Sequence, residues 1–163
     1  MTYIITKPRP SLFYYNVDAQ HTGNNTQTIV SNILIPANSV GSNNALYVEQ
    51  GFYKVGAGGT CTWTTYLSSN SNNIVGASVL YNAINTATNL SAQGHRTIVN
   101  KNSQNSNYAY MQTGGVENSW LNSNLARVAI NKDFANDLYI ITTVQLGLNT
   151  DIGGVDFTIC KIF

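Results

Sequence analysis

Apolar and polar residues alternate with a period of two along most of this chain. Between residues 45 and 55, Leu46 and Val48 fall on one side of an extended backbone and polar residues fall on the other. This is the period of a β-strand with one buried face. Pro36 ends the preceding apolar run, because proline has no N–H to contribute to a sheet. Residues 28–35 and 45–55 are therefore predicted to be two strands joined by a turn.

The same pattern returns further along the chain, with Gly, Asn and Ser between the apolar runs. No stretch combines a periodic helical face of three turns with capping residues. About eight short strands separated by turns predict an all-β fold, an antiparallel β-sandwich of the jelly-roll type. Because the chain ends in a strand, we expect the first and last strands to pair. The other predicted strands cover residues 60–67, 74–84, 93–99, 107–112, 137–148 and 155–163, with an irregular segment at 118–131 that ends in a strand.

Composition narrows the classes of partner. Charged residues make up 9% of the chain and the net charge is +1, while 23 residues are Asn, which suits tight turns. The scattered basic residues argue against binding to nucleic acid or an anionic membrane, and no apolar run approaches the ~20 residues that span a bilayer. No signal-peptide pattern precedes the first strand, so we expect assembly in a cytoplasm. Cys61 and Cys160 are read as two small buried hydrophobes, with a single bridge as the alternative.

Residues 1–22 differ from the rest and are predicted to form an extended N-terminal docking arm, with the jelly-roll domain at 23–163. Pro8 and Pro10 disfavour helix and central strand. Two interpretations stay open: an edge strand on its own domain, or an arm that docks on a neighbouring subunit. On the docking interpretation, deleting residues 1–17 leaves a folded domain. The arm residues that need burial are Ile4, Ile5, Leu12, Phe13, Tyr14 and Tyr15.

The chain offers little for catalysis. Its seven acidic residues include Asp133 and Asp137, whose spacing fits a shared Ca²⁺ but lacks an EF-hand pattern. Glu49 is predicted on the outer face of its strand, which is a poor place for a general acid. His21 and His95 have no metal-ligating residue at zinc spacing and are expected on the surface or facing a partner. We therefore expect no enzymatic activity, no catalytic or metal-binding residue and no cofactor.

Aromatic residues give the one positive indication of binding. Tyr108, Tyr110 and Trp120 lie around a Gly-Gly turn and next to an Asn-rich loop. Exposed aromatic rings stack on sugar faces and Asn side chains bond to hydroxyls, so these three are candidate glycan-binding residues. Tyr and Trp are also enriched where subunits pack together. Interface packing is the alternative interpretation.

Several short motifs resemble small jelly-roll modules of tailed-bacteriophage virion proteins. Residues 33–39 read Ile-Leu-Ile-Pro-Ala-Asn-Ser and lead into the strand at 46–49. Residues 56–63 read Gly-Ala-Gly-Gly-Thr-Cys-Thr-Trp, a Gly-rich turn before an aromatic strand. Residues 95–98 and 100–103 are similar to the middle strand and loop of those modules.

The resemblance covers residues 26–163 and implies a virion protein without catalytic residues. Such modules occur in head fibres, decoration proteins and tail or receptor-binding tips, which are commonly homotrimers. Heptads and a long shaft are missing here, which favours a compact component. The resemblance thus implies a trimeric head fibre or decoration protein that docks on other virion proteins of a capsid or tail, located in the virion and assembled in the host cytoplasm. The alternative is a tail-fibre or receptor-binding tip, or a carbohydrate-binding module that recognises a bacterial surface glycan.

Overall fold

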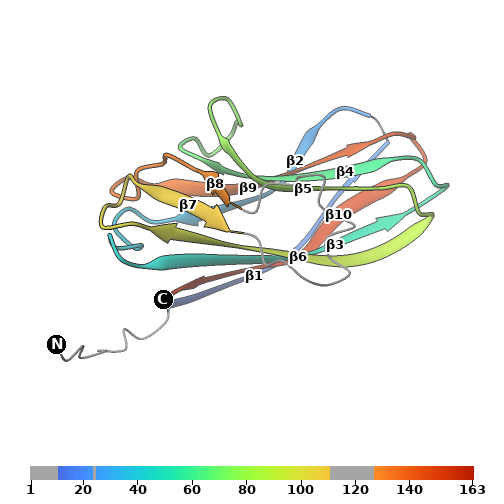
Figure 1. Cartoon of the computed structure of the whole chain (residues 1–163). Helices are drawn as coiled ribbons and strands as arrows, with labels where there is room; N and C mark the ends of the chain where they lie inside the picture. The colour runs from blue at the N-terminus through green and yellow to red at the C-terminus, as the bar shows by residue number, and fades with distance from the viewer. Residues whose placement is uncertain (1–10, 24, 111–126) are drawn as a thin grey trace.

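The computed structural model describes residues 11–23, 25–110 and 127–163 of the 163-residue chain. These residues form ten β-strands in two antiparallel sheets that pack face to face (Figure 1). The strands are β1 (Ser11–Thr22), β2 (Thr28–Ile35), β3 (Ala45–Val55), β4 (Cys61–Ser68), β5 (Ser78–Asn85), β6 (Asn89–Asn100), β7 (Asn107–Tyr110), β8 (Arg127–Ala129), β9 (Leu138–Leu146) and β10 (Ile152–Ile162).

The pairing order is that of a jelly roll. Sheet A has the order β1-β10-β3-β6-β7-β8, and sheet B has the order β2-β9-β4-β5. Without β7 and β8, two four-stranded sheets remain, and the chain passes from one sheet to the other at every connection except β4–β5. The predicted all-β jelly-roll sandwich is confirmed. The structure has ten strands rather than about eight because β7 and β8 extend sheet A beyond β6.

The core fills the space between the sheets with the inward side chains of both. Leu46, Val48 and Phe52 of β3 are buried, as their period predicts. The Phe52 ring lies 5.9 Å from the ring of Trp63 on β4, centroid to centroid. The indole N–H of Trp63 donates a 3.0 Å hydrogen bond to the carbonyl of Gly154, so the largest core side chain leaves no polar atom unpaired.

A polar network crosses the middle of this core. The amide nitrogen of Gln50, on β3, donates to the hydroxyls of Thr142 on β9 at 2.8 Å and Thr158 on β10 at 2.9 Å. Its amide oxygen accepts from the Thr65 hydroxyl on β4 at 2.6 Å. All four side chains are fully buried. Because buried polar groups are costly unless paired, this network fixes the two sheets in one relative position.

Residues 11–22 belong to sheet A. Strand β1 pairs with β10 from Ser11 opposite Ile162 to Thr22 opposite Ile152, with an irregularity between Asn16 and Ala19. The first and last strands therefore pair, as predicted, and Figure 1 shows the C-terminus beside the start of β1. The sandwich begins at Ser11, so the expected domain boundary at residue 22 moves toward the N-terminus. Docking through this segment stays a prediction.

Turn chemistry accounts for two strand ends. Asn38 adopts a left-handed backbone with φ of 62° in the turn after β2, as the Asn-rich composition predicts. The predicted strand at 74–84 begins only at Ser78, because Ile74 accepts a turn hydrogen bond from Ala77 N–H and Gly76 has φ of 68°. A positive φ is incompatible with an extended strand.

Candidate binding surfaces

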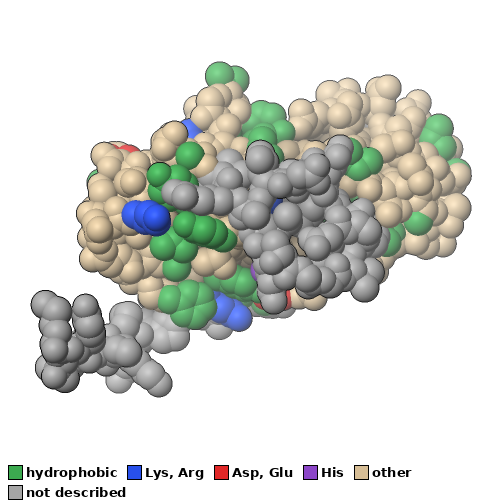
Figure 2. All heavy atoms as spheres, viewed as in Figure 1, with side chains coloured by type: hydrophobic (Ala, Val, Ile, Leu, Met, Phe, Trp, Pro, Cys, Tyr) green, Lys and Arg blue, Asp and Glu red, His purple; other side chains and the backbone are tan. Residues whose placement is uncertain are grey.

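Tyr108 and Tyr110 lie on the outer face of sheet A. In β7 they are half-buried, while Asn107 and Ala109, which alternate with them, are buried. The Lys101 ammonium lies 5.4 Å from the centroid of the Tyr108 ring. Figure 2 shows Lys or Arg side chains against hydrophobic side chains over this part of the molecule. The structure thus brings these two candidate glycan-binding residues to one face, with a cation already over one ring.

Trp120, the third candidate, lies outside the described residues. Of the arm residues, Ile4 and Ile5 also lie outside them. The other four occupy consecutive positions in the backbone of β1, opposite Lys161 to Thr158 of β10. These four residues are Leu12, Phe13, Tyr14 and Tyr15.

A second group of aromatic and cationic side chains continues across sheet A. Tyr47 on β3 packs against His95 on β6, with ring centroids 5.6 Å apart, and the Lys161 ammonium lies 5.5 Å from the Tyr47 centroid. Cross-strand register places Tyr47 opposite Thr97, which in turn lies opposite Tyr110. The sequence alone does not indicate that Tyr47, Thr97 and Tyr110 lie in one row, because the row becomes visible only when the pairing of the three strands is known.

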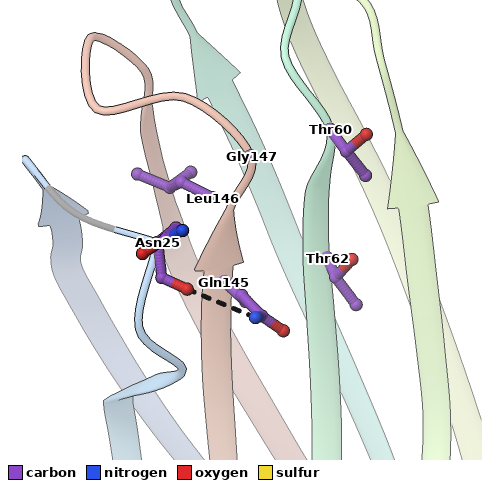
Figure 3. Close-up of a pocket in the computed structure, with 6 residues that line it drawn as sticks. All are labelled: Asn25, Thr60, Thr62, Gln145, Leu146 and Gly147. Atoms are coloured by element: carbon purple, nitrogen blue, oxygen red, sulfur yellow. Dashed lines mark hydrogen bonds between the residues drawn. The ribbon is translucent and has the colours of Figure 1, made fainter.

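A pocket of about 290 Å³ opens beside sheet B at the start of β4 (Figure 3). Its walls are amides, hydroxyls and backbone, with no charged or aromatic lining residue. Gln145 donates a 3.2 Å hydrogen bond to the carbonyl of Asn25, and the two approach each other across the pocket. Neutral donors and acceptors of this kind suit a polar, uncharged group. The lining residues are Asn25, Thr60, Thr62, Gln145, Leu146 and Gly147.

A buried ion pair lies at one end of sheet A. The Lys54 ammonium lies 3.1 Å from Asp151 Oδ2, and both side chains are fully buried. Lys54 also donates to the carbonyl of Ala87 at 2.6 Å, and Asp151 accepts from Ala57 N–H at 2.6 Å. Burial raises the pKa of the Asp151 carboxyl, but the Ala57 hydrogen bond and the Lys54 charge outweigh burial and lower that pKa below its ordinary value.

Two glycines of the turn at 56–59, Gly56 and Gly59, lie against the Asp151 carboxylate of this ion pair. A side chain on Gly56 would collide with Asp151, and a Cβ on Gly59 would lie 2.7 Å from Asp151 Oδ2. Asp151 therefore ties the β3–β4 turn to the β9–β10 turn. Glycine is needed there for close approach to a carboxylate of the same chain.

We expected no catalytic role for Asp133, Asp137 and Glu49. In the structure, each of them either accepts a hydrogen bond in a turn or lies on the outer face of its sheet. Asp133 accepts from Ala135 N–H at 3.0 Å, and Asp137 accepts from Ala37 N–H at 2.8 Å. Glu49 is half-buried on the outer face, as predicted, and accepts from Gln93. Among the described residues, no group of three His, Cys, Asp or Glu side chains is placed to hold a metal ion.

The histidines differ from each other. His95 is half-buried on the outer face against Tyr47, whereas His21 in β1 is buried, so the expected surface position is wrong for His21. Cys61 and Cys160 are free and buried, which confirms the reading as two small hydrophobes. Burial raises the pKa of each thiol to about 12.

Sheet B carries no charged side chain. None of its strands, β2, β4, β5 and β9, contains Asp, Glu, Lys, Arg or His. Sheet A, by contrast, holds Glu49, Lys54, Arg96 and Lys161. The strands of sheet B instead expose four branched aliphatic residues. They are Ile29 (37% exposed), Leu34 (40%), Val79 (46%) and Ile84 (37%).

No family model and no curated protein matches this chain. Solved structures similar to it include infectious bursal disease virus Gt strain, at 11% identity and a TM-score of 0.38, and the Gx strain, at 8% and 0.35. The VP2 subviral particle of that virus is similar at 10% identity and a TM-score of 0.31. Each covers 99% of this chain, which spans less than half, 45–46%, of the other chain. Within the described residues, no helix is long and apolar enough to cross a membrane.

Proposed function

We propose that this chain is a non-enzymatic structural protein of a virus particle, a jelly-roll subunit that assembles as a homotrimer. The observation that carries the proposal is the uncharged sheet B with its exposed aliphatic residues. A sheet face without charge and with exposed Leu, Ile and Val is suited to packing against protein. Among the described residues, two sets of buried polar side chains serve the fold: Gln50 joins the sheets, and Lys54 with Asp151 joins two turns.

The finer proposal is a head fibre or decoration protein of a tailed bacteriophage. It is supported by the motifs at 33–39 and 56–63 and by the jelly-roll pairing order. On this proposal the segment 1–22 docks on other virion proteins of the capsid or tail, and assembly takes place in the host cytoplasm. Because 11–22 form an edge strand, a docking test removes residues 1–10 only and leaves β1 complete.

The test of the trimer is the mass of the purified full chain by size-exclusion chromatography with light scattering. We expect three times the 17.7 kDa of one chain at micromolar concentration. A single monomeric species would contradict the proposal. The docking test compares virions made with and without residues 1–10. We expect a folded protein of unchanged melting temperature that is no longer incorporated.

A second candidate function is recognition of a bacterial surface glycan, as in a tail-fibre or receptor-binding tip. Two observations favour it: Tyr108 and Tyr110 share one outer face, and the pocket beside Gln145 is lined by neutral amides and hydroxyls. Binding of two variants to a glycan array distinguishes the aromatic face from the pocket. Loss of binding in Tyr110→Ala points to the aromatic face, and loss in Gln145→Ala points to the pocket. Absence of binding to any glycan and to host cells would end this alternative.

A further inference from the structure

One row of outward side chains crosses four neighbouring strands of sheet A. Lys161 of β10 lies opposite Tyr47 of β3, and Tyr47 lies opposite Thr97 of β6. Thr97 in turn lies opposite Tyr110 of β7. All four side chains are half-buried, and each follows a buried residue in its strand, so they share the outer face. Because every step is a direct cross-strand pair, this tyrosine row is continuous.

Two ammonium groups lie against tyrosine rings on this face. Lys161 Nζ is 5.5 Å from the centroid of Tyr47, and Lys101 Nζ is 5.4 Å from the centroid of Tyr108. A ring within about 6 Å attracts an ammonium group, so both charges are held beside the face. Within the described part of the chain, neither of these two lysines has a carboxylate at ion-pair distance. Both charges are therefore available to an anionic ligand.

The two charges stand far apart on the sheet. Lys101 follows the last residue of β6 and continues the pairing with β7, because its N–H donates to the carbonyl of Ser106 at 2.8 Å. Two strand spacings separate Lys161 from Thr97, and four residue steps separate Thr97 from Lys101, which places the two lysine positions roughly 16 Å apart. A single sugar ring cannot contact both ammonium groups, so a ligand that uses both is a chain of several units.

The side chains between the two charges are those that bind sugars. Tyrosine rings stack on the apolar faces of sugar rings, and the Thr97 hydroxyl lies in the row between Tyr47 and Tyr110. The Tyr47 ring is already packed against His95, with the ring centroids 5.6 Å apart. A side chain that is fixed before binding loses little conformational entropy when the ligand arrives.

The spacing of charge favours an acidic glycan over a nucleic acid. A single-stranded nucleic acid carries a charge on every nucleotide and is bound along a continuous positive groove. This face instead has two separated ammonium groups with neutral side chains between them, and the Glu49 carboxylate lies on the same face opposite His95. A glycan in which acidic sugars are separated by neutral sugars has charges spaced in the same sparse way.

We propose that the outer face of sheet A binds an acidic oligosaccharide, whose carboxylates contact Lys101 and Lys161 and whose intervening sugars lie over the tyrosine row. This inference rests on glycan recognition, the second candidate function, and names the chemical class of the glycan. The charge complementarity of two unpaired ammonium groups and the stacking surface between them support it.

The first experiment compares acidic sugars with their neutral counterparts. The probes are oligosaccharides that contain uronic or sialic acids, each beside the same oligosaccharide after its carboxyl groups have been reduced to alcohols. Exposed charge contacts typically change affinity by about two- to fivefold each, so the full chain should prefer the acidic form by about fourfold or more. Raising sodium chloride from about 0.05 M to about 0.5 M should weaken binding of the acidic form only.

The second experiment removes the two charges. Lys101→Gln and Lys161→Gln should each weaken binding of the acidic form by about two- to fivefold, and the double variant should bind both forms equally. Lys101→Arg and Lys161→Arg keep the charge and should keep the preference. The matched control is Lys132→Gln, because the Lys132 ammonium donates to the carbonyl of Gly76 in the β4–β5 connection. Thermal unfolding checks each variant, and Lys101 lies outside the strands, so its variant keeps the test valid if Lys161→Gln unfolds.

The outcomes separate this inference from the function on which it rests. Absence of binding to any glycan removes glycan recognition and this inference together. Equal binding of the acidic and reduced forms by wild type keeps glycan recognition and overturns the acidic class. A preference that survives the double lysine variant overturns the proposed face. Tighter binding of a single-stranded thymidine oligonucleotide than of every acidic oligosaccharide would also overturn the proposal.

Discussion

The two sheets of this sandwich differ in the kind of polar side chain that they bury. Sheet A holds charged side chains inside the fold, where Lys54 pairs with Asp151 at its end and Arg96 donates to the carbonyl of Leu80 at 2.7 Å. Sheet B has no charged residue in any strand, and its buried polar side chains are hydroxyls such as Thr65 and Thr142.

On the proposed function, this difference separates the residues that stabilise the fold from the residues that would contact another chain. Buried charges hold one arrangement of turns, because each charge is costly without its partner. The uncharged sheet B contributes apolar packing to the core on its inner face, and its exposed side chains carry no charge. Sheet A is thus the part whose substitution should reduce the stability of the fold, and the outer face of sheet B is the part whose substitution should change assembly.

The largest effect is expected when one buried charge of sheet A loses its partner. Lys54→Met leaves the Asp151 carboxylate buried without its ammonium. Removing one partner of a buried pair typically lowers the free energy of unfolding by about 3–5 kcal/mol. Urea unfolding followed by circular dichroism measures it.

Two further variants sharpen that result. Lys54→Met combined with Asp151→Asn should lose less than Lys54→Met alone, because no uncompensated charge remains. Asp156→Ala removes an exposed carboxylate from β10 and should change the free energy of unfolding by no more than about 0.5 kcal/mol. Equal losses for Lys54→Met and Asp156→Ala would show that the ion pair has no structural role.

A smaller loss is expected from the network that joins the sheets. Gln50→Leu removes the partner of the Thr142, Thr158 and Thr65 hydroxyls. Leaving buried polar groups unpaired should lower the free energy of unfolding by about 1–3 kcal/mol. Gln93→Leu, which changes an exposed residue of β6, is the control. An unchanged unfolding midpoint for Gln50→Leu would mean that the hydroxyls pair equally well without it.

Acid should destabilise the fold by protonating Asp151, the partner of Lys54 in sheet A. The pKa of Asp151 is lowered in the fold from an ordinary value of 3.8. Its contribution to stability is therefore complete above that value and is lost as the pH falls from it through the lower pKa of the folded state. Urea midpoints in a series down to about pH 3 should fall less in Asp151→Asn than in wild type. Parallel curves for the two proteins would contradict this assignment.

The smallest effect is expected from the cysteines, where the two sheets behave alike. Cys61 of sheet B and Cys160 of sheet A are both free and buried, and burial raises the pKa of each thiol to about 12. At pH 8 neither is a thiolate, so a thiol reagent should label neither in the native protein. Both should react after denaturation, and a reductant should leave the melting temperature unchanged. Rapid labelling of the native protein would show that one thiol is accessible.

Local pattern predicted the strands well and the contacts poorly. The bounds of β2 and β3 follow from the period of two and from Pro36, which are properties of adjacent residues. The pairing of Lys54 with Asp151 joins residues far apart in the chain, and no spacing rule connects them. The uncharged character of sheet B was present in the sequence, but it becomes a feature only when β2, β9, β4 and β5 are known to lie side by side.

The candidate sites divide in the same way: local sequence predicts some of their features, and contacts between distant residues set the others. The period of two placed Glu49 on the outside from local sequence alone, whereas the common face of Tyr108 and Tyr110 is seen only in the strand β7 itself. The aromatic and proline content of residues 1–22 suggested a separate arm, yet the register with β10 is set by the last strand of the chain. Pairing at that distance is a tertiary property, which a local pattern cannot contain.

The most direct test of this account is the mass of the wild-type protein at low and high salt. A contact through uncharged strands should be insensitive to screening, whereas one through the charged face of sheet A should weaken. Light scattering in about 0.05 M and about 1 M sodium chloride, where the Debye length falls to about 3 Å, compares the two. We expect three times 17.7 kDa at both concentrations. A monomer at low salt, or a trimer that dissociates as salt rises, would contradict assembly through sheet B.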